Sequence, residues 1–458
     1  MDIQDRSARE QQATELLGEL EDAGVHGVAL TFVDNSGITR VKSVPVSKLA
    51  SAAAWGVGMS PVFDAFRLDD MILSGTYAGS PVGDLRLHPD LARLTVLAGQ
   101  PGWAWAPVDR YDQDGTAHPQ CSRLLAGRMV GALAELGLAA YLAFEVEWAV
   151  SVGDGDDFVA ACKGPAYGMT RITELSDYCV DLLAALAAQG VSVDQLHPEY
   201  AAGQMEISVS AESPVDAADT FVLVRETIRA VSLRHGLRAS FSPKVMAEGV
   251  GNGAHVHLSL WADDANVMTG GDGEYGLSTR AASFTAGVLD RLPALLAVGA
   301  PSVASYLRLI PSHWAGAFAC WGLENRETAL RYVTGPVGNR EQSANLEVKC
   351  LDATANPYLV VAALLAAGLA GLAEQAQLPA PVSIDPAALS PQERAAAGIK
   401  PLPSSLEGAV AAFEQEPALG RAFGVELATT IAELRRFEME LFAESSPEEV
   451  AALTRWKH

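Results

Sequence analysis

Acidic side chains recur on one face of strand-like segments in this 458-residue chain. In residues 144–148, alternation along a strand places two glutamates on one face and apolar side chains on the other. Residues 199–206 carry one glutamate in a turn and a second in the following strand, and residues 345–349 carry a glutamate between an amide and a lysine. These acids are Glu145, Glu147, Glu199, Glu206 and Glu347.

A fourth segment, residues 249–259, joins a glycine-rich loop to a strand that carries His255, His257 and Ser259 on one face. Glycines allow a backbone to approach a ligand closely. Because the loop leads into a strand and not a helix, it does not match a dinucleotide-binding fingerprint.

Each segment alone has an ordinary alternative, the solvent-facing side of an antiparallel strand with solvated histidines or paired charges. Taken together, five glutamates and two histidines without a cysteine suit hard divalent cations, Mg²⁺ or Mn²⁺. The set is large enough for two ions, an arrangement that neutralises charge on a transferring phosphoryl group. The pattern therefore predicts a two-metal phosphoryl-transfer site.

Three arginines form a second group of candidate functional residues. Arg308, Arg326 and Arg331 lie in two short segments, and a guanidinium grips carboxylates and phosphates with two parallel hydrogen bonds. The alternative for each is a surface arginine paired with one of the many acids. The chain contains no GxxxxGK[ST] P-loop and no GxSxG nucleophile elbow, which excludes those nucleotide and hydrolase sites.

Composition limits the partners. The chain has 32 Lys+Arg against 56 Asp+Glu, a net charge of −24, which argues against a nucleic acid or an anionic membrane surface. The five cysteines are far apart and odd in number, which favours buried thiols in a reducing compartment. The N-terminus is polar and unlike a signal peptide, and the apolar run 358–373 is shorter than a membrane span. We therefore expect a cytoplasmic enzyme in which this run is a core helix.

The elements that must position these residues form an α+β protein. An amphipathic helix at about 6–22 precedes two strands, 27–34 and 38–46, joined by a hairpin turn at Asn35-Ser36-Gly37. From Cys121 onward, long Ala/Leu helices alternate with short strands. We place a boundary near His118, between an N-terminal domain of residues 1–118 and a catalytic domain of residues 119–458.

Several motifs together resemble the glutamine synthetase superfamily over nearly the whole chain. They stand in the family's order and at its separations, and read FEVEW, EYAAGQME, GNGAHVHLSL, SYLRLIP, ENRETALR and EVKCLDATANPYL. The resemblance implies an N-terminal β-grasp domain and a catalytic domain with a curved antiparallel sheet and flanking helices. It also implies a homo-oligomer, a dodecamer of two hexameric rings with active sites between neighbouring subunits.

The same resemblance assigns roles residue by residue. It implies one metal ion at Glu147, Glu199 and Glu206, and a second at Glu145, His255 and Glu347, each Mg²⁺ or Mn²⁺. ATP as co-substrate is assigned to His257, Ser259, Arg331 and Asn345. L-glutamate is assigned to Gly251, Arg308 and Lys349, with Arg308 at its α-carboxylate, and Arg326 is the arginine that stabilises the phosphoryl-transfer transition state.

Departures from the family pattern concern the nitrogen substrate. Trp314 occupies the position of a flap glutamate that serves ammonia-using members, and residues 58–64 differ from the family stretch whose aspartate binds ammonium. Asn345 and Lys349 stand where the family has arginines. An indole wall favours a larger, partly apolar ammonium through cation–π contact. We expect an amine pocket at Trp314 and His313, with Asp64 or His313 as the base.

The sequence thus predicts an ATP-dependent ligase that joins the γ-carboxylate of L-glutamate to an organic amine through γ-glutamyl phosphate. It is similar to the γ-glutamylethanolamide and γ-glutamylpolyamine synthetase branch of the family. An ethanolamine-like monoamine is favoured because the sequence shows no extra acidic cluster near Trp314. The alternatives are a γ-glutamylpolyamine synthetase, an ammonia-using glutamine synthetase, and a non-catalytic structural or regulatory family member.

Overall fold

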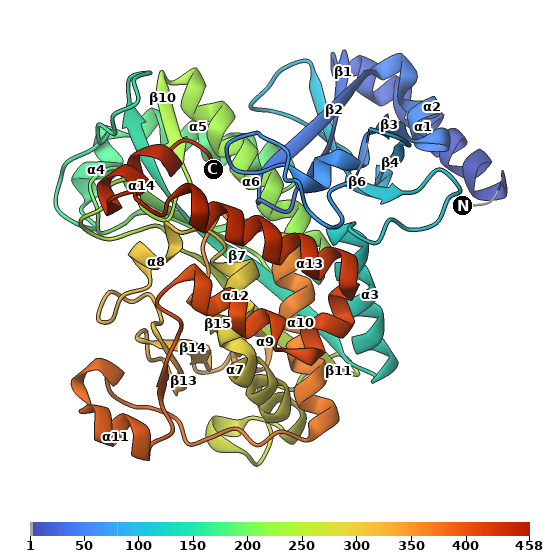
Figure 1. Cartoon of the computed structure of the whole chain (residues 1–458). Helices are drawn as coiled ribbons and strands as arrows, with labels where there is room; N and C mark the ends of the chain where they lie inside the picture. Colours follow the sequence, from blue (N-terminus) through green and yellow to red (C-terminus); the bar gives the residue numbers. More distant parts are fainter. Residues whose placement is uncertain (1–2, 80) are drawn as a thin grey trace.

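Two β-sheets built from separate stretches of chain organise the computed structural model, which describes residues 3–79 and 81–458 (Figure 1). The first sheet has the strand order β2-β1-β6-β4-β3, with β5 paired to β6. Its strands are β1 (Gly27–Val33), β2 (Thr39–Pro45), β3 (Val57–Met59), β4 (Leu85–Pro89), β5 (Thr95–Val96) and β6 (Trp103–Tyr111).

The hairpin predicted around Gly37 is confirmed, because β1 and β2 pair antiparallel across it. β1 also pairs parallel with β6, so the sheet is mixed. The predicted amphipathic helix is α1 (Ile3–Asp22), which packs against α2 (Leu49–Trp55) over this sheet. Leu30, Leu49 and Leu87 are buried in the core that they share. This arrangement fits the expected N-terminal grasp domain.

The second sheet has the order β16-β13-β14-β15-β11-β7-β9-β8, with β10 paired to β7 and β12 to β11. Neighbouring strands are antiparallel except for β13 and β14, which are parallel. The prediction of an α+β fold with a curved antiparallel sheet is confirmed, with that one parallel pair as a departure. Its strands are β7 (Ala139–Val152), β8 (Val193–Pro198), β9 (Gln204–Val209), β10 (Leu237–Ser240), β11 (Ala254–Ala262), β12 (Ala265–Asn266), β13 (Phe318–Leu323), β14 (Thr328–Val333), β15 (Asn345–Val348) and β16 (Lys400–Pro401).

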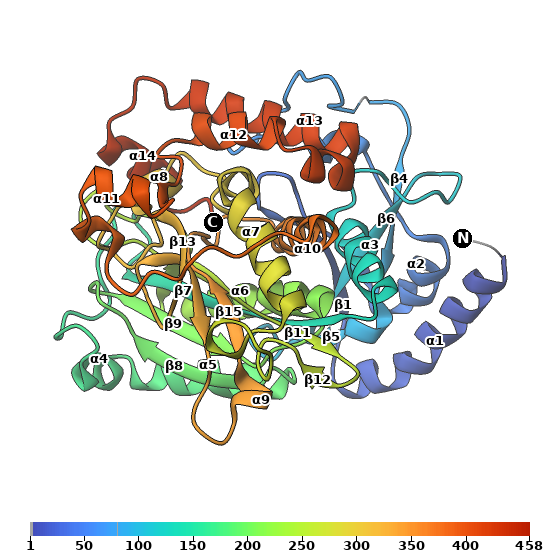
Figure 2. The ribbon, with the colours of Figure 1, turned by 90° about the horizontal axis from the view of Figure 1, so that it is seen from below.

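Helices cover this sheet, and α12 and α13 lie side by side along one edge of the molecule (Figure 2). The predicted core helix is α10, which packs against α7, α3 and α13. Helices α7 and α10 are long and apolar enough to span a membrane by composition, but they are 83% and 72% buried inside the protein. The helices are α3 (Ser122–Glu135), α4 (Met169–Glu174), α5 (Ser176–Ala188), α6 (Pro214–Arg234), α7 (Thr279–Gly299), α8 (Ser305–Arg308), α9 (Arg340–Ser343), α10 (Pro357–Glu374), α11 (Pro391–Ala396), α12 (Leu406–Glu414), α13 (Pro417–Leu441) and α14 (Pro447–Thr454).

Packing on the back of the second sheet decides which face is free for chemistry. Phe144 of β7 packs against Phe221 of α6, with ring centroids 4.6 Å apart, and both side chains are buried. Because side chains alternate along a strand, burying Phe144 under α6 turns Glu145 to the opposite face. The helices thus position the acidic face without contributing to it.

Candidate active site

Strand register brings the predicted polar residues together. In the antiparallel ladder, His255 lies directly opposite Glu145, and Glu206 lies opposite Glu147. Glu347 lies opposite both His257 on one side and Arg331 on the other. Side chains of directly opposed residues point to the same face of a sheet, only about 5 Å apart at Cβ. Residues separated by up to 200 positions therefore share one surface.

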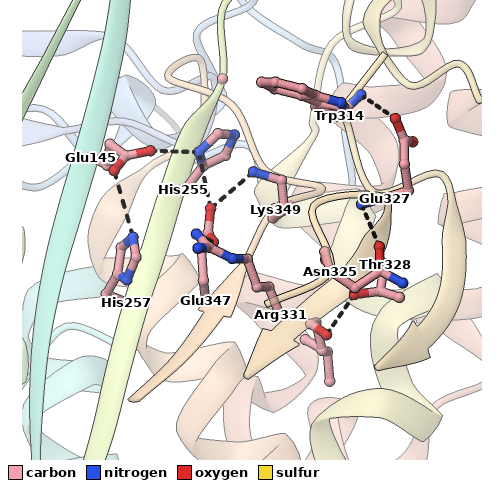
Figure 3. Close-up of polar contacts among 12 residues, drawn as sticks. Glu145, His255, His257, Trp314, Asn325, Glu327, Thr328, Arg331, Glu347 and Lys349 are labelled. Atoms are coloured by element: carbon pink, nitrogen blue, oxygen red, sulfur yellow. Dashed lines mark hydrogen bonds and ion pairs between the residues drawn. The ribbon is translucent and has the colours of Figure 1, made fainter. Parts of the chain in front are cut away.

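The first cluster consists of Glu145, His255 and Glu347 (Figure 3). His255 Nδ1 lies 2.9 Å from Glu145 Oε1 and 3.4 Å from Glu347 Oε1. Lys349 Nζ donates to Glu347 Oε1 at 2.9 Å, and Arg331 Nη1 donates to Glu347 Oε2 at 3.0 Å. The Glu347 carboxylate thus lies between the His255 imidazole and the two cationic side chains.

Charge around the first cluster keeps its acids ionised. Burial opposes ionisation of Glu145, but hydrogen bonds to His255 and His257 outweigh it and hold its pKa well below the usual range. Burial also acts against Glu347, and the charges of Lys349 and His257 overcome it and lower its pKa. Both carboxylates are therefore ready to ligate a cation at neutral pH.

The second cluster consists of His197, Glu199 and Glu206. His197 Nε2 lies 3.0 Å from Glu206 Oε1, and His197 Nδ1 lies 3.7 Å from Glu199 Oε1. Glu147 stands beside this group, where its Oε2 accepts hydrogen bonds from Gln204 Nε2 at 3.0 Å and from the Gly253 amide at 2.9 Å. Sequence reasoning missed His197, although its spacing of two from Glu199 was a usable signal.

Several carboxylates meet at the second cluster with little positive charge to offset them. Burial raises the pKa of Glu206 to about 8. The negative charges of Glu145, Glu147 and Glu199 also raise this pKa, whereas the hydrogen bond to His197 lowers it. That hydrogen bond raises the pKa of His197 to about 9. The pKa of Glu199 is raised by burial and by the charge of Glu147.

The donor chemistry of both clusters fits hard divalent cations. In each, one ligand atom from every member lies within 4.8 Å of the others, and the atoms are carboxylate oxygens and imidazole nitrogens. A divalent cation bound beside Glu206 would offset the neighbouring carboxylates that raise the pKa of this acid. Glutamine synthetase enzymes use ATP with Mg²⁺ or Mn²⁺, in agreement with this donor set.

A cavity of about 940 Å³ lies over this face of the sheet. The predicted residues that line it are Glu145, Glu147, Glu199, Glu206, Gly251, His255, His257, Arg308, His313, Trp314, Arg326, Arg331 and Lys349. Glu347 and Asn345 stand behind the wall, where the Asn345 amide oxygen lies 2.9 Å from His257 Nδ1. The Ser259 hydroxyl accepts the Trp261 indole N–H at 2.9 Å and does not line the cavity.

Two arginines carry unused donors in this cavity. Arg308 Nη1 and Arg331 Nε are buried without a hydrogen-bond partner among the described residues. Arg308 Nη2 does donate to His255 Nε2 at 3.2 Å and to the Lys349 carbonyl at 3.1 Å. A buried donor left unpaired is costly, so these atoms are suited to receive an anion from a substrate.

The glycine loop before β11 allows Arg308 to approach. A Cβ on Gly253 would lie 2.5 Å from Arg308 Nη2, and one on Gly251 would lie 2.2 Å from the Pro243 carbonyl oxygen. At Gly251 the close neighbour is backbone, so only glycine fits, whereas a side chain at Gly253 would displace the Arg308 guanidinium. The loop identified from sequence thus permits close packing around the arginine.

Trp314 stands on a loop at the cavity mouth with 53% of its surface exposed. Its backbone is left-handed, with φ of 55°, and its amide donates to Glu327 Oε1 at 3.1 Å (Figure 3). The Arg326 guanidinium lies 5.7 Å from the indole centroid. A second acid, Asp385, accepts the Ser312 hydroxyl at 3.0 Å on the same loop. Two acids thus contact the Trp314 loop, although neither lines the cavity.

Asp64 is not brought to this cavity within the chain. Its carboxylate is 1% exposed in the N-terminal domain, where it binds Arg110 and lies 2.8 Å from His118 Nε2. These two partners overcome burial and lower its pKa. Within the chain, a carboxylate that is buried and paired in this way is not accessible to an amine, so the geometry favours a structural role over the predicted base.

Comparisons with known proteins agree with this site. Residues 119–452 match the family model described as the catalytic domain of glutamine synthetase. The chain is 56% identical over 456 residues to gamma-glutamylpolyamine synthetase GlnA3 of Streptomyces coelicolor, covering 99% of this chain and 98% of that protein. It is 30% identical to a glutamine synthetase of Halobacterium salinarum, covering 92% of each chain. A crystal structure titled as a novel glutamine synthase homologue superposes with a TM-score of 0.85 at 31% identity, covering 95% of this chain and 99% of that one.

Proposed function

Because the chain belongs to the glutamine synthetase family of ATP-dependent ligases, we propose that it joins the γ-carboxylate of L-glutamate to an organic amine. In the first step, ATP phosphorylates the γ-carboxylate to give γ-glutamyl phosphate and ADP. In the second, the amine nitrogen attacks the acyl carbon, and phosphate leaves from the tetrahedral intermediate. The products are a γ-glutamylamide, ADP and phosphate.

The two acidic clusters are the proposed metal positions. Glu145, His255 and Glu347 hold one ion, and Glu147, Glu199 and Glu206 hold the other, with His197 added to the latter group by its contact with Glu206. Bound there, divalent cations supply positive charge that offsets the carboxylate and phosphate oxygens of the substrates. The low pKa of Glu145 and the raised pKa of Glu206 support this division.

The unpaired arginine atoms support the proposed anion contacts. Arg308, with its free Nη1, binds the α-carboxylate of glutamate beside Gly251 and Lys349. Arg331, with its free Nε, binds a nucleotide phosphate together with His257. Hydrogen bonds from Arg308 to His255 and the Lys349 carbonyl, and from Arg331 to the carboxylates of Glu347 and Glu324, orient the two guanidinium groups before substrate arrives.

The remaining assignments rest on position. Asn345 orients His257 by accepting from its Nδ1, which supports an indirect role at the nucleotide. Arg326 lines the cavity beside Trp314, where it stabilises charge on the transferring phosphoryl group. Ser259 has the least support, since it lies outside the cavity wall.

The acceptor is proposed to be a polyamine. The preference for an ethanolamine-like monoamine relied on the lack of an extra acidic cluster near Trp314, whereas Glu327 and Asp385 both bond to that loop. Aromatic rings of Tyr167, Tyr200 and Trp314 also line the cavity, which suits an alkyl ammonium chain. The name of the 56% identical relative supports the same class of acceptor.

His313 is the proposed base for the amine. It lines the cavity next to Trp314, and its Nδ1 donates to the Pro311 carbonyl at 3.0 Å, which leaves Nε2 as the acceptor. We further propose that the enzyme acts in the cytoplasm as a ring-shaped homo-oligomer with an N-terminal domain ending near residue 118.

Initial-rate kinetics with ATP and glutamate test the proposal, using putrescine, spermidine, ethanolamine and ammonium at matched ionic strength. We expect the highest kcat/KM with a polyamine. Asp385→Asn should raise KM for putrescine about threefold to tenfold and leave ethanolamine unchanged, because only the diamine carries a second charge. Asp290→Asn, which removes an exposed acid from α7, is the matched control. A preference for ethanolamine in both variants and wild type would instead support the monoamine.

A further inference from the structure

A second cavity of about 340 Å³ shares no lining residue with the catalytic cavity. Its wall comes from α6, from β10, from the residues that follow α14, and from Ile38 and Thr39 at the start of β2. Figure 1 shows the end of the chain lying beside α6 and α14. The cavity therefore joins the N-terminal hairpin to the C-terminal segment.

The charge of this cavity is opposite to that of the protein. Four cationic side chains line it in a chain whose net charge is −24, His458 in the lining carries the terminal carboxylate, and the one side-chain carboxylate of the lining is Glu226. That acid is already paired with Arg229 at 2.7 Å. We call this group the basic pocket, and define it as Arg225, Arg229, Arg238, Lys457 and His458.

Arg225 is the most deeply buried cation of the basic pocket. Its side chain is 1% exposed, and it makes no hydrogen bond or ion pair with any of residues 3–79 and 81–458. The rings of Phe221 and Phe241 hold the guanidinium, with centroids 5.3 Å and 5.1 Å away. Burial and the nearby charge of Arg229 lower its pKa to about 9. A buried cation without a counter-ion is strongly unfavourable.

Three other buried arginines do have ion-pair or hydrogen-bond partners. Arg110 is paired with Asp64, and Arg123 with Asp219 at 2.8 Å. Arg171 donates to the carbonyl oxygens of Gly164, Glu199, Tyr200 and Ala201. Unused donors on Arg308 occur in the catalytic cavity, where a substrate anion is expected. By the same reasoning, the unpaired Nε of Arg225 is suited to an anion, since the nearby charges of Glu226 and Asp352 reach Arg225 without a hydrogen bond.

His458 adds a second unsatisfied group. Its side chain is 95% buried, and Nδ1 has no hydrogen-bond partner among the described residues. Burial and the charges of Arg225 and Arg229 hold its pKa well below the usual value, so the imidazole is neutral. A neutral ring provides a hydrogen bond to a ligand without adding charge.

We propose that the basic pocket binds a small organic dianion that carries phosphate or carboxylate oxygens. The guanidinium groups of Arg225 and Arg229 suit two-point contact with such oxygens. The volume equals that of about ten water molecules, which exceeds a bare phosphate ion. Leu233, Ala239 and Trp456 supply an apolar wall for the organic part.

Thermal unfolding and calorimetric titration of the full-length protein test this site. The probes are inorganic phosphate, phenyl phosphate and glutarate, each compared with potassium chloride at equal ionic strength. We expect at least one organic dianion to raise the unfolding midpoint by about 3 °C at saturation, and Arg225→Met to weaken its binding about 30-fold. Phenyl phosphate or glutarate as the stronger ligand assigns the anion to phosphate esters or to dicarboxylates.

Arg225→Met also tests the unpaired charge directly. Without added anion, the variant should unfold at a higher temperature than wild type, because it removes a buried cation that has no partner. Arg229→Gln tests the same pocket if the first variant folds poorly, and Arg128→Gln, at an exposed position on α3, is the matched control. The catalytic cavity also meets these anions, but it is unaltered in all variants and contributes equally.

Three results would overturn the proposal. The first is an equal response of wild type, Arg225→Met and Arg229→Gln to all three anions. The second is no response of wild type beyond that to chloride. The third is a lower unfolding temperature and a changed oligomer size of Arg225→Met in anion-free buffer, which would show that a neighbouring subunit supplies the missing partner.

Discussion

Cation binding at the second cluster should release protons, because its central acid retains one at neutral pH. Burial raises the pKa of Glu206 to about 8, and the hydrogen bond between Glu206 and His197 raises the pKa of that imidazole to about 9. A metal ion bound to Glu206 requires this carboxylate in its deprotonated form. Binding at this cluster therefore competes with protons throughout the neutral range.

The pKa of Glu206 determines how strongly metal affinity changes with pH. Below pH 8 the protonated fraction grows, and each unit of pH weakens apparent affinity by a factor of up to ten. Between pH 8.5 and pH 6.5 we expect the Mn²⁺ affinity of this cluster to fall about twentyfold. At the first cluster the pKa of Glu145 lies well below the usual range, so that acid contributes no such loss.

The assay is calorimetric titration of Mn²⁺ at pH 6.5, 7.5 and 8.5, in buffers with different ionisation enthalpies. Wild type should release about one proton per ion bound at the weaker class of sites at pH 7.5. Glu206→Gln should abolish this release, whereas the matched variant Glu145→Gln should lose the other class of sites and keep it. Unchanged proton release in Glu206→Gln would refute the reasoning.

Further predictions concern single residues and the metal. Trp314→Ala should raise KM for the amine about 2-fold to 30-fold in initial-rate assays, since a cation–π contact is worth about 0.5–2 kcal/mol, and an unchanged amine KM would exclude that contact. Arg326→Gln should lower kcat on the order of 10³-fold with little change in glutamate binding measured by calorimetry, and equal loss of both would mean that it acts in binding. Glu347→Gln removes the carboxylate that pairs at 2.9 Å with Lys349, a side chain that is only 2% exposed. The variant should destabilise the metal-free protein by about 3 kcal/mol in denaturant titrations. An unaltered unfolding midpoint would count against this pairing. Removal of divalent cations with a chelator should abolish ATP-dependent turnover, with Mg²⁺ or Mn²⁺ restoring it; activity that persists in the chelator would contradict the metal assignments.

Alternation along strands was sufficient to predict the acidic face. A period of two separates Glu145 and Glu147 from Phe144, and packing of Phe144 on α6 leaves no other orientation for the acids. The strand register itself is a long-range property. That His255 faces Glu145 depends on pairing across 110 residues, which local pattern alone does not specify, and only the family resemblance supplied it.

Residues that sequence reasoning missed are positioned by tertiary contacts. His197 immediately precedes Pro198, and its importance comes from its partner Glu206 on the neighbouring strand. Glu327 follows Arg326 in an arginine-bearing segment, and only the fold shows that its carboxylate receives the Trp314 amide. Asp64 illustrates the same dependence on tertiary contacts, since its place in the sequence suggested an amine base, whereas within the chain Arg110 and His118 enclose its carboxylate.

We propose that this chain transfers the γ-glutamyl group to an organic amine in preference to ammonia. One competition experiment tests it directly: enzyme, ATP, Mg²⁺ and limiting L-glutamate are mixed with equimolar putrescine, ethanolamine and ammonium, and the products are quantified by mass spectrometry. We expect γ-glutamylputrescine as the main product and little glutamine. Glutamine as the main product would contradict it.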